Sequence, residues 1–348
     1  MKIYYIDNVE ELYKVQSQWE DIYNSSNSKT NPFLNFYRVL ALFNLNKTIQ
    51  KFKTRIAVVE RDNKIVMFLP LSIRKIYAFI NVIYFAGAEF ADYNDFLINP
   101  QYEYLIEDVL KKILSRRDIC ILRGIKEESK LLKPFLTLHS HSEETTHSPY
   151  INLVEKSSDY YEVSDESAIK DARYNIRRLS KNGKIDFVII KKENYKSEFE
   201  KLVTMHQHEW NSKGMHSMFD DYRCIQYYNE LFKQSDCNKQ LFMSKVIVND
   251  VVISYFFGFI VDNSLLYYKP TYSIEHSKFS PGKIHIYFLI KYCVENKIPY
   301  FDFMVGVEEY KFKWTNEVTP IFSKFISKSN FLVSLMKQKE RMKYEKDR

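Results

Sequence analysis

The feature that most constrains this sequence is that its two halves carry the same order of predicted elements. Each half reads as two helices, a hairpin, a strand, a helix and a short strand that ends near a glycine. The hairpin turns are expected at 61–64 and 249–250, and the closing glycines are Gly124 and Gly306. This period is far longer than that of a solenoid. The sequence therefore predicts one α/β domain used twice.

Apolar periodicity supplies the elements behind this order. In the first half, helices are expected over 9–23, 33–43 and 102–114, and strands over 55–60, 65–73, 81–85 and 119–122. In the second half, helices are expected over 173–180, 199–210, 222–232 and 282–295, and strands over 185–190, 241–248, 251–261, 264–268 and 300–303.

The length of 348 residues suits two domains. We expect them at 1–150 and 151–330, with a polar boundary near 139–158 and a basic C-terminal helix at 331–348. Hydrophobic residues make up 45% and charged residues 27%, so the chain is globular rather than disordered. The net charge of +7 is modest, and acidic residues are interspersed with the lysines. We therefore expect no nucleic-acid partner.

Cysteine usage and hydropathy indicate a cytoplasmic protein without metal. The four cysteines lie at 120, 224, 237 and 293, and no two have the spacing of a metal site. Reduced thiols are the expected state. The most apolar window, 66–87, is interrupted by Arg74, Lys75 and Asn81, which makes it too broken to cross a bilayer of ~30 Å. We expect no transmembrane segment or signal peptide, and the oligomeric state stays open.

A turn directly before a predicted helix is the first candidate site. The sequence Ser280-Pro281-Gly282-Lys283 combines a proline for the first helical turn with a glycine that lets a bulky ligand approach. Free N–H groups at a helix start, with the helix dipole, bind anions, and a pyrophosphate fits there. An ordinary helix-starting turn is the alternative. The first half has Ile98-Asn99-Pro100-Gln101 at this place, without glycine or a basic residue, so we expect no phosphate there.

A carboxylate and a lysine follow the helix predicted over 282–295. Alternation in the strand 300–303 sends Asp302 to the face opposite Phe301 and Phe303. A functional carboxylate and a structural ion pair are both open for Asp302. Lys311 and Lys313 lie beyond the glycine at 306, where solvated surface charges are the alternative to a functional role.

Several motifs occur in the order and spacing of a known family. Tyr272 precedes a Phe-Ser-Pro-Gly turn at 279–282, which is followed by Phe-Asp-Phe-x-x-Gly at 301–306 and Tyr-Lys-x-x-Trp at 310–314. Further motifs are Arg-x-x-x-Arg-Arg at 173–178 with a glycine at 183, His-x-Trp-x-x-x-Gly at 208–214, and Asp-Tyr-Asn-Asp-Phe-Leu at 92–97. Together they resemble the CelD/BcsL-type acetyltransferases of the GNAT superfamily, which are similar to the FemAB/FemX peptidyltransferases.

The resemblance implies two tandem GNAT-like (acyl-CoA N-acyltransferase) domains, each a mixed sheet flanked by helices, with the acceptor in the cleft between them. It implies acetyl-CoA or another acyl-CoA as co-substrate at the second domain and a first domain that lacks the donor site. The family is associated with polysaccharide and cell-surface glycan pathways. The expected acceptor is therefore a small molecule, an amine of a nucleotide-linked amino sugar or a related precursor, with a sugar hydroxyl as the alternative.

Roles for individual residues follow from the resemblance. The turn residues Ser280, Pro281, Gly282 and Lys283 would hold the donor phosphates, and a backbone N–H near Tyr268 would face the donor carbonyl. Asp302 would act as base and Lys311 would stabilise charge. The residues expected to contact the acceptor are Asp92, Asp95, Arg177, Trp210 and Tyr310. His206 and His208 are alternative bases; their spacing of two on a helix points them to different faces and argues against a zinc pair.

Two other functions stay open. The usual GNAT turn is richer in glycine than this one, which leaves room for an aminoacyl-tRNA donor as in FemX. No long charged coiled-coil pattern of the kind often inserted in FemX-like enzymes is present. A non-catalytic GNAT-like binding module is the second alternative, and the retained Ser-Pro-Gly turn, Asp302 and Lys311 argue against it.

Overall fold

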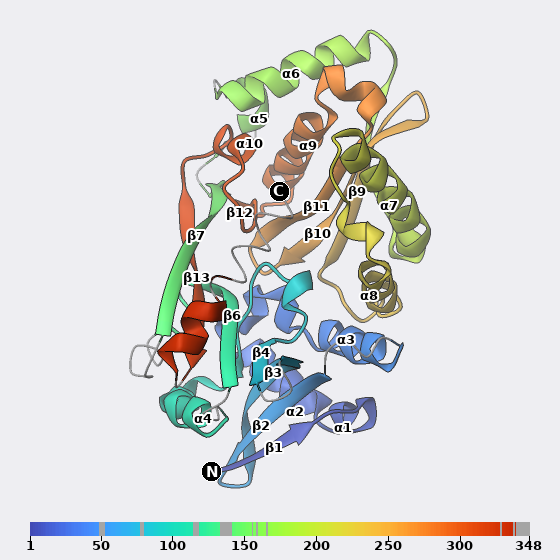
Figure 1. Ribbon diagram of the computed structural model, residues 1–348. Helices are drawn as coiled ribbons and strands as arrows, with labels where there is room; N and C mark the ends of the chain where they lie inside the picture. The colour runs from blue at the N-terminus through green and yellow to red at the C-terminus, as the bar shows by residue number, and fades with distance from the viewer. Residues whose placement is uncertain are drawn as a thin grey trace. The chain divides into compact units, whose positions relative to one another are not determined.

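The computed structural model describes residues 1–48, 53–76, 80–113, 118–132, 141–154, 156–157, 159–164, 166–327, 329–336 and 338. The chain forms two compact units, one of Met1–Thr146 with Pro320–Arg348 and one of His147–Thr319 (Figure 1). This division differs from the expected domains at 1–150 and 151–330. Residues after 319 belong to unit 1 because β13 (Val318–Ser327) pairs antiparallel with β6 (Asp118–Lys126) of that unit.

The expected polar boundary near 139–158 differs from the structure, whereas the expected C-terminal helix is described only in part. Residues 139, 140, 155 and 158 of the boundary lie outside the described residues, and the rest begins with a strand, β7 (His141–Asn152). Its serines, threonines and histidines lack the apolar alternation of a predictable strand. In the C-terminal segment 331–348, residues up to 336 continue a helix that begins at 330, and most of the remainder lies outside the described residues.

Unit 1 is built on a mixed sheet in the order β1-β2-β3-β4-β6-β13, in which β4 and β6 are parallel. Ile56 and Val58 pack against α1–α3, whereas their neighbours Ala57 and Val59 pack against α4 on the other face. The other elements of this unit are β1 (Lys2–Ile6), α1 (Val9–Lys14), α2 (Gln16–Ser25), α3 (Phe36–Thr48), β2 (Lys53–Arg61), β3 (Lys64–Ile76), β4 (Ile80–Phe85), β5 (Leu97–Ile98), η4 (Pro100–Leu105) and α4 (Ile106–Ile113).

Unit 2 is built on a second mixed sheet in the order β7-β12-β11-β10-β9-β8, in which β11 and β12 are parallel. Its other elements are α5 (Tyr160–Val163), α6 (Ser167–Ser180), β8 (Ile185–Ile189), α7 (Tyr195–Ser212), α8 (Tyr222–Phe232), β9 (Leu241–Val248), β10 (Val251–Val261), β11 (Ser264–Tyr272), η8 (Ile274–Phe279), α9 (Pro281–Glu295), β12 (Tyr300–Asp302) and α10 (Glu309–Phe312).

Helices cover both faces of the sheet of unit 2. Phe256 and Tyr267 face the core formed with α5, α6 and α9. Their neighbours Phe257 and Tyr268 face α7 and α8, where they pack edge-on against the ring of Tyr228. Alternation along β10 and β11 therefore assigns one row of aromatic rings to each layer (Figure 1). None of the helices in the described parts of the chain is long and apolar enough to cross a membrane.

A buried histidine fixes α9 on the sheet. His285 is 1% exposed and lies between two serines of neighbouring strands, with Nε2 at 2.9 Å from Ser244 Oγ and Nδ1 at 2.8 Å from Ser254 Oγ. Burial lowers the pKa of His285 to about 3, so the ring is neutral at pH 7. Both ring nitrogens have partners, and this sets the rotation of the helix about its axis.

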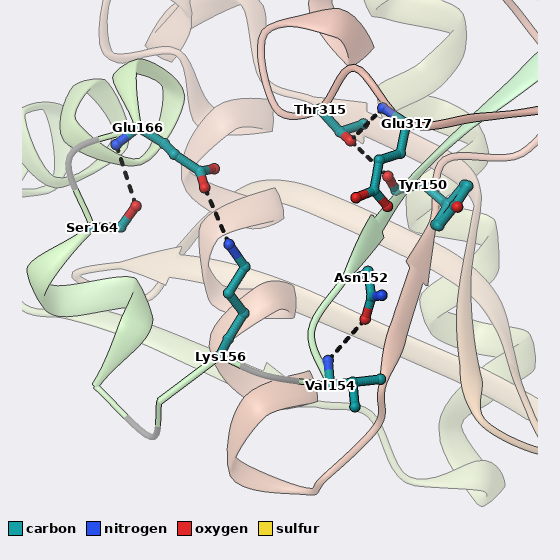
Figure 2. A network of polar contacts seen from close by, with 8 residues as sticks. All are labelled: Tyr150, Asn152, Val154, Lys156, Ser164, Glu166, Thr315 and Glu317. Carbon is teal, nitrogen blue, oxygen red and sulfur yellow. Dashed lines mark hydrogen bonds and ion pairs between the residues drawn. The ribbon is translucent and has the colours of Figure 1, made fainter.

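Short polar contacts also order the segment between β7 and α6 (Figure 2). The side chain of Asn152 accepts from Val154 N at 3.0 Å, and Ser164 Oγ accepts from Glu166 N at 3.2 Å. Lys156 Nζ lies 3.5 Å from Glu166 Oε1. These contacts define where α6 begins, which matters because α6 reaches the start of α9.

A carboxylate network ties α7 to the sheet. Glu198 is 8% exposed and accepts from Lys245 Nζ at 2.8 Å, from Tyr255 Oη at 2.9 Å and from Lys201 Nζ at 2.8 Å. Burial by itself raises the pKa of Glu198, but these three hydrogen bonds outweigh it and lower the pKa to about 2. The network therefore favours the ionised carboxylate in the folded state.

Replacement of Glu198 tests this network. Glu198→Gln should lower the free energy of unfolding by about 1.5–3 kcal/mol, because hydrogen bonds to a charged group are lost. The wild-type advantage should be complete above the ordinary pKa of 4.5 and should disappear as the pH falls towards 2. Urea unfolding across this pH range measures it. Glu200→Gln, an exposed position on the same helix, should change stability by less than about 0.5 kcal/mol; equal effects of the two variants would contradict the assignment.

Candidate active site

The start of α9 presents free backbone donors. Ser280 precedes the helix with a left-handed φ of 53°, and its side chain makes no cap hydrogen bond. Pro281 occupies the first helical turn, and Ile284 N donates to Ser280 O at 3.2 Å. Within the described residues, the N–H groups of Gly282 and Lys283 have no acceptor. They lie at the positive end of a 15-residue helix, an arrangement that binds anions.

The surroundings of this turn are cationic and open. A Cβ added at Gly282 would meet only Tyr272 Cδ1, at 3.7 Å, so little protein covers the backbone there. Lys283 Nζ pairs with Asp171 Oδ2 of α6 at 2.7 Å. The Arg178 guanidinium lies 5.4 Å from the centre of the Phe279 ring and donates to Lys278 O at 3.4 Å. A phosphate at this turn would therefore meet backbone donors and two cationic side chains.

In the corresponding turn of unit 1, a side chain accepts a hydrogen bond from one of the free backbone N–H groups. The Asn99 side chain accepts from Gln101 N at 3.1 Å, so one N–H at the start of η4 is already satisfied. Pro100 occupies the first turn of η4, as Pro281 does in α9. The two copies of the domain thus differ at this position: a side chain caps the turn in unit 1, and none caps the start of α9.

β11 and β12 separate after a short parallel pairing. Their register runs from Ser264 opposite Tyr300 to Leu266 opposite Asp302, whereas β11 continues to Tyr272. β12 pairs with β7 on its other side, and Phe303 N continues this bonding by donating to Pro149 O at 2.9 Å. Within the described residues, the pairing of β11 with β12 ends at Leu266.

Asp302 lies where this pairing ends. Its Oδ1 accepts from Ser148 Oγ at 2.9 Å and from Met304 N at 2.7 Å. Phe301 and Phe303 are buried, with 0% and 1% exposure, while Asp302 is partly exposed, as alternation predicted. The carboxylate thus joins β7 to the loop that follows β12.

Lys311 holds the loop that follows Asp302 by hydrogen bonds to its backbone carbonyls. Its residue is 3% exposed, and Nζ donates to Met304 O at 3.2 Å and to Val305 O at 3.1 Å. Nζ also lies 3.0 Å from Glu308 Oε2. Met304 has a φ of 63°, which is rare for a residue with a side chain. Asp302 and Lys311 therefore meet at Met304, one at its N–H and the other at its carbonyl.

The end of β11 is anchored from α7. Glu209, 5% exposed, accepts from Thr271 Oγ1 at 2.8 Å and from Tyr272 N at 3.1 Å. Its other oxygen accepts from Lys213 Nζ at 2.6 Å. The sequence analysis missed Glu209, Asp171 and Ser148 because their partners lie far along the chain and no local motif marks them.

The side chain of Tyr268 is directed into the α7–α8 layer. It is 6% exposed, and its hydroxyl lies 2.8 Å from Tyr228 Oη. Lys269 Nζ lies 4.0 Å from the centre of its ring. The expectation for this position concerned the backbone N–H, which these side-chain contacts leave untested.

The expected acceptor residues of unit 2 lie on three different helices, α6, α7 and α10. Arg177 is exposed on α6. The indole of Trp210 on α7 stacks on the imidazole of His206 at 5.2 Å, and the ring of Tyr310 on α10 lies edge-on to Phe303 at 6.5 Å. Their shared role in binding an acceptor stays a prediction.

The two alternative histidine bases point apart, as their spacing predicted. His206 is 5% exposed, and its Nδ1 lies 2.9 Å from Ser217 Oγ. Burial lowers the pKa of His206 to about 4, with Lys269 and Lys213 adding to the effect. His208 is exposed, with Nε2 at 3.0 Å from Glu275 Oε1. His206 thus has a core role and His208 a surface ion pair.

Asp92 and Asp95 lie in a loop of unit 1 that packs on the end of β6. Asn94 N, between them, donates to Gly124 O at 2.8 Å. Gly124 has a φ of +76°, and a Cβ there would lie 2.4 Å from Asp92 O, so only glycine fits. Asp95 accepts from Phe96 N at 2.8 Å, and burial raises its pKa to about 7. No group of three or more possible metal ligands occurs in the described parts of the chain.

Comparison with protein families identifies the second half of the chain. Residues 166–312 match the family model of the acetyltransferase (GNAT) domain. This segment is therefore similar to a GNAT acetyltransferase domain. It includes the uncapped start of α9, the end of the β11–β12 pairing and the Asp302–Lys311 loop. The chain therefore contains an enzyme domain of the N-acyltransferase class. No curated protein matches the sequence.

Solved structures extend the fold assignment to the whole chain. FemX aligns with a TM-score of 0.60 and 12% identity over 97% of this chain and 99% of its own. A conserved protein of unknown function from Bacteroides thetaiotaomicron aligns with a TM-score of 0.60 and 10% identity over 94% of this chain and 100% of its own. A tandem GNAT protein from the clavulanic acid biosynthesis pathway aligns with a TM-score of 0.51 and 9% identity over 93% and 98%.

These alignments confirm the predicted fold class. Each unit is a mixed sheet flanked by helices, and the two units together have the tandem GNAT-like α/β fold. At identities of 9–12% the likeness concerns the fold alone and not the substrate.

The pKa of Asp95 gives a test of the unit 1 loop. Because burial raises this pKa from 3.8 to about 7, the folded state keeps a proton that the unfolded chain loses in between. Asp95 should therefore make stability fall as the pH rises from about 4 to about 7. Asp95→Asn retains an oxygen for Phe96 N and should flatten this dependence. Urea unfolding from pH 4 to 8 measures it; identical pH profiles for both proteins would refute the assignment.

Proposed function

We propose that unit 2 transfers an acyl group, in the first instance acetyl, from acyl-CoA to an amine of a nucleotide-linked amino sugar or a related cell-surface glycan precursor. The observation that carries this proposal is the uncapped start of α9, together with the short β11–β12 pairing, within a segment that matches a GNAT acetyltransferase domain. The acceptor class rests on the motifs that resemble the CelD/BcsL-type family. An enzyme that consumes acyl-CoA would work in the cytoplasm.

In this proposal the donor phosphates bind the N–H groups of Gly282 and Lys283. Lys283 Nζ would exchange Asp171 for a phosphate oxygen, since the carboxylate at 2.7 Å is its present partner. Ser280 and Pro281 set the direction of the turn. The thioester would lie along β11 beyond Leu266, where a backbone N–H near Tyr268 would stabilise the oxygen as charge builds; one such donor is worth about 3–4 kcal/mol.

Asp302 is the proposed base. It would accept the proton of the acceptor ammonium, after which the amine nitrogen attacks the thioester carbon. The carbon–sulfur bond then breaks and CoA leaves as the thiol. A positioned base contributes about 10²–10⁴-fold. The place of Asp302 at the end of the β11–β12 pairing supports this role.

Lys311 is proposed to stabilise charge indirectly, because its ammonium holds the loop that contains Met304 and Val305. Its ammonium already has two carbonyls and Glu308 as partners, which favours a positioning role over direct contact with substrate. Asp92, Asp95, Arg177, Trp210 and Tyr310 remain the proposed acceptor contacts. Two aromatic side chains and hydrogen-bonding groups of this kind suit a nucleotide sugar.

The likeness to FemX keeps an aminoacyl-tRNA donor as the second candidate. The two functions differ in their donor. Calorimetry with acetyl-CoA against charged tRNA separates them, and binding of neither would favour a non-catalytic module.

Gly282 offers a sharp test of the phosphate site. Gly282→Asp should leave α9 folded and stabilise it by about 0.3–1 kcal/mol, because a carboxylate at a helix start complements the dipole. The same charge should repel the donor and raise the Kd for acetyl-CoA at least tenfold. Gly282→Asn is the matched neutral control and should weaken binding less. Calorimetry and thermal melting give both quantities; unchanged affinity in Gly282→Asp would exclude this turn as the phosphate site.

Asp302→Asn tests the base. The amide oxygen can still accept from Ser148 Oγ and Met304 N, so the loop should keep its conformation. Acetyl transfer to UDP-glucosamine should nevertheless fall more than tenfold while the Kd for acetyl-CoA stays unchanged. Ser148→Ala, which removes a hydrogen bond but keeps the carboxylate, should lose much less. A near-normal rate in Asp302→Asn would remove this residue from the mechanism.

A further inference from the structure

The C-terminal helix of unit 1, residues 330–336, has apolar side chains on all its sides. Five of its seven residues are apolar, and the two polar ones are Asn330 and Ser334. A helix that is apolar all round is normally buried all round. None of the roles proposed above involves this helix, so the face that it turns away from the sheet needs a separate explanation.

One side of the C-terminal helix packs on the sheet of unit 1. Val333 and Met336 are 7% and 3% exposed. They belong to a core cluster with Val82 of β4, Ile121 of β6 and Phe325 of β13. The helix would have to give up these contacts to turn its outer side chains inwards, so the cluster fixes which side chains face outwards.

The outer side of the C-terminal helix is apolar as well. Phe331 is 73% exposed, the highest fraction among the large hydrophobic side chains of the described residues. Leu335, one turn later, is 36% exposed. Residues four apart on a helix are neighbours on one face, so the two side chains form one apolar strip.

Basic residues accompany this strip. Arg74 is exposed on β3 and lies opposite Val82 of β4, so its side chain leaves the sheet on the face that the C-terminal helix covers. The Arg123 guanidinium lies 5.7 Å from the centre of the Phe325 ring on the same face. In the sequence after the helix, at 337–348, six residues are Lys or Arg and three are Asp or Glu. The occupant of the strip is therefore expected to carry negative charge.

These features favour a lipid surface over a second protein chain. A second copy would bring the basic segments of two chains together, and like charges repel. Two side chains one turn apart also offer far less area than the roughly 800 Å² per partner that a stable protein interface buries. An anionic bilayer takes up single apolar side chains at its headgroup boundary and attracts each nearby Lys or Arg.

We infer that the C-terminal helix docks unit 1 on an anionic lipid surface, with Phe331 and Leu335 at the boundary between headgroups and acyl chains. Arg74 and the basic residues after 336 would face the lipid phosphates. This inference goes beyond the proposed function and does not depend on the identity of the donor or the acceptor.

Vesicle sedimentation tests the docking. The protein should bind vesicles of equal parts phosphatidylglycerol and phosphatidylcholine at least tenfold more tightly than vesicles of phosphatidylcholine alone, and about 0.5 M NaCl should remove most of the difference. Phe331→Ser should weaken binding to the anionic vesicles at least tenfold and leave the melting temperature unchanged, because this side chain is exposed. Tyr104→Ser is the matched control, since Tyr104 is 70% exposed on η4 at the other face of the same sheet, and should keep the wild-type binding.

Each other outcome counts against the docking. Equal binding by wild type and Phe331→Ser, or equal binding to anionic and neutral vesicles, would overturn the inference. A dimer that Phe331→Ser dissociates in analytical ultracentrifugation, without vesicle binding, would do the same, because a second copy would then occupy the strip. If Phe331→Ser lowers the melting temperature, Leu335→Ser and Arg74→Gln take its place, and each should weaken binding to the anionic vesicles at least threefold.

Discussion

The geometry of unit 2 depends on one constraint: Asp302 and Lys311 both hydrogen-bond to the backbone of Met304. One residue accepts from the Met304 N–H and the other donates to its carbonyl, so the backbone is held at a positive φ. The chain continues its bonding to β7 at Phe303, while the pairing with β11 ends at Leu266 opposite Asp302. The same unit contains the start of α9, where no side chain caps the helix.

Comparison of the two units shows how small the change between a structural turn and a candidate site is. Both have a proline in the first turn of the helix. In unit 1 the Asn99 side chain satisfies the backbone, whereas the residue before α9 is Ser280 in a left-handed conformation that makes no cap. The fold supplies the helix dipole in both units, and one side chain decides whether a donor remains for a ligand.

Local signals in the sequence were sufficient for most of the elements and for the turn before α9. Both hairpin turns fell at Asn-Asp or Asp-Asn pairs with positive φ, a backbone state that only a few residues tolerate. The strand β7 could not be predicted because its polar residues do not alternate with apolar ones. The return of β13 to unit 1 depends on pairing with residues about 200 positions away, which no local pattern encodes. For the same reason the sequence did not reveal the ion-pair and hydrogen-bond partners of the site, which are Asp171, Ser148 and Glu209.

The position of β13 has a consequence for biosynthesis. Unit 1 is discontinuous: its sheet needs β6, made early, and β13, made after the whole of residues 147–319. A growing chain that leaves the ribosome cannot complete this sheet until residue 327 has been translated. Domains usually fold in the order of synthesis, but here unit 2 is the first to have all its strands. Until β13 arrives, β6 lacks this partner, and an unpaired strand edge favours pairing with other chains.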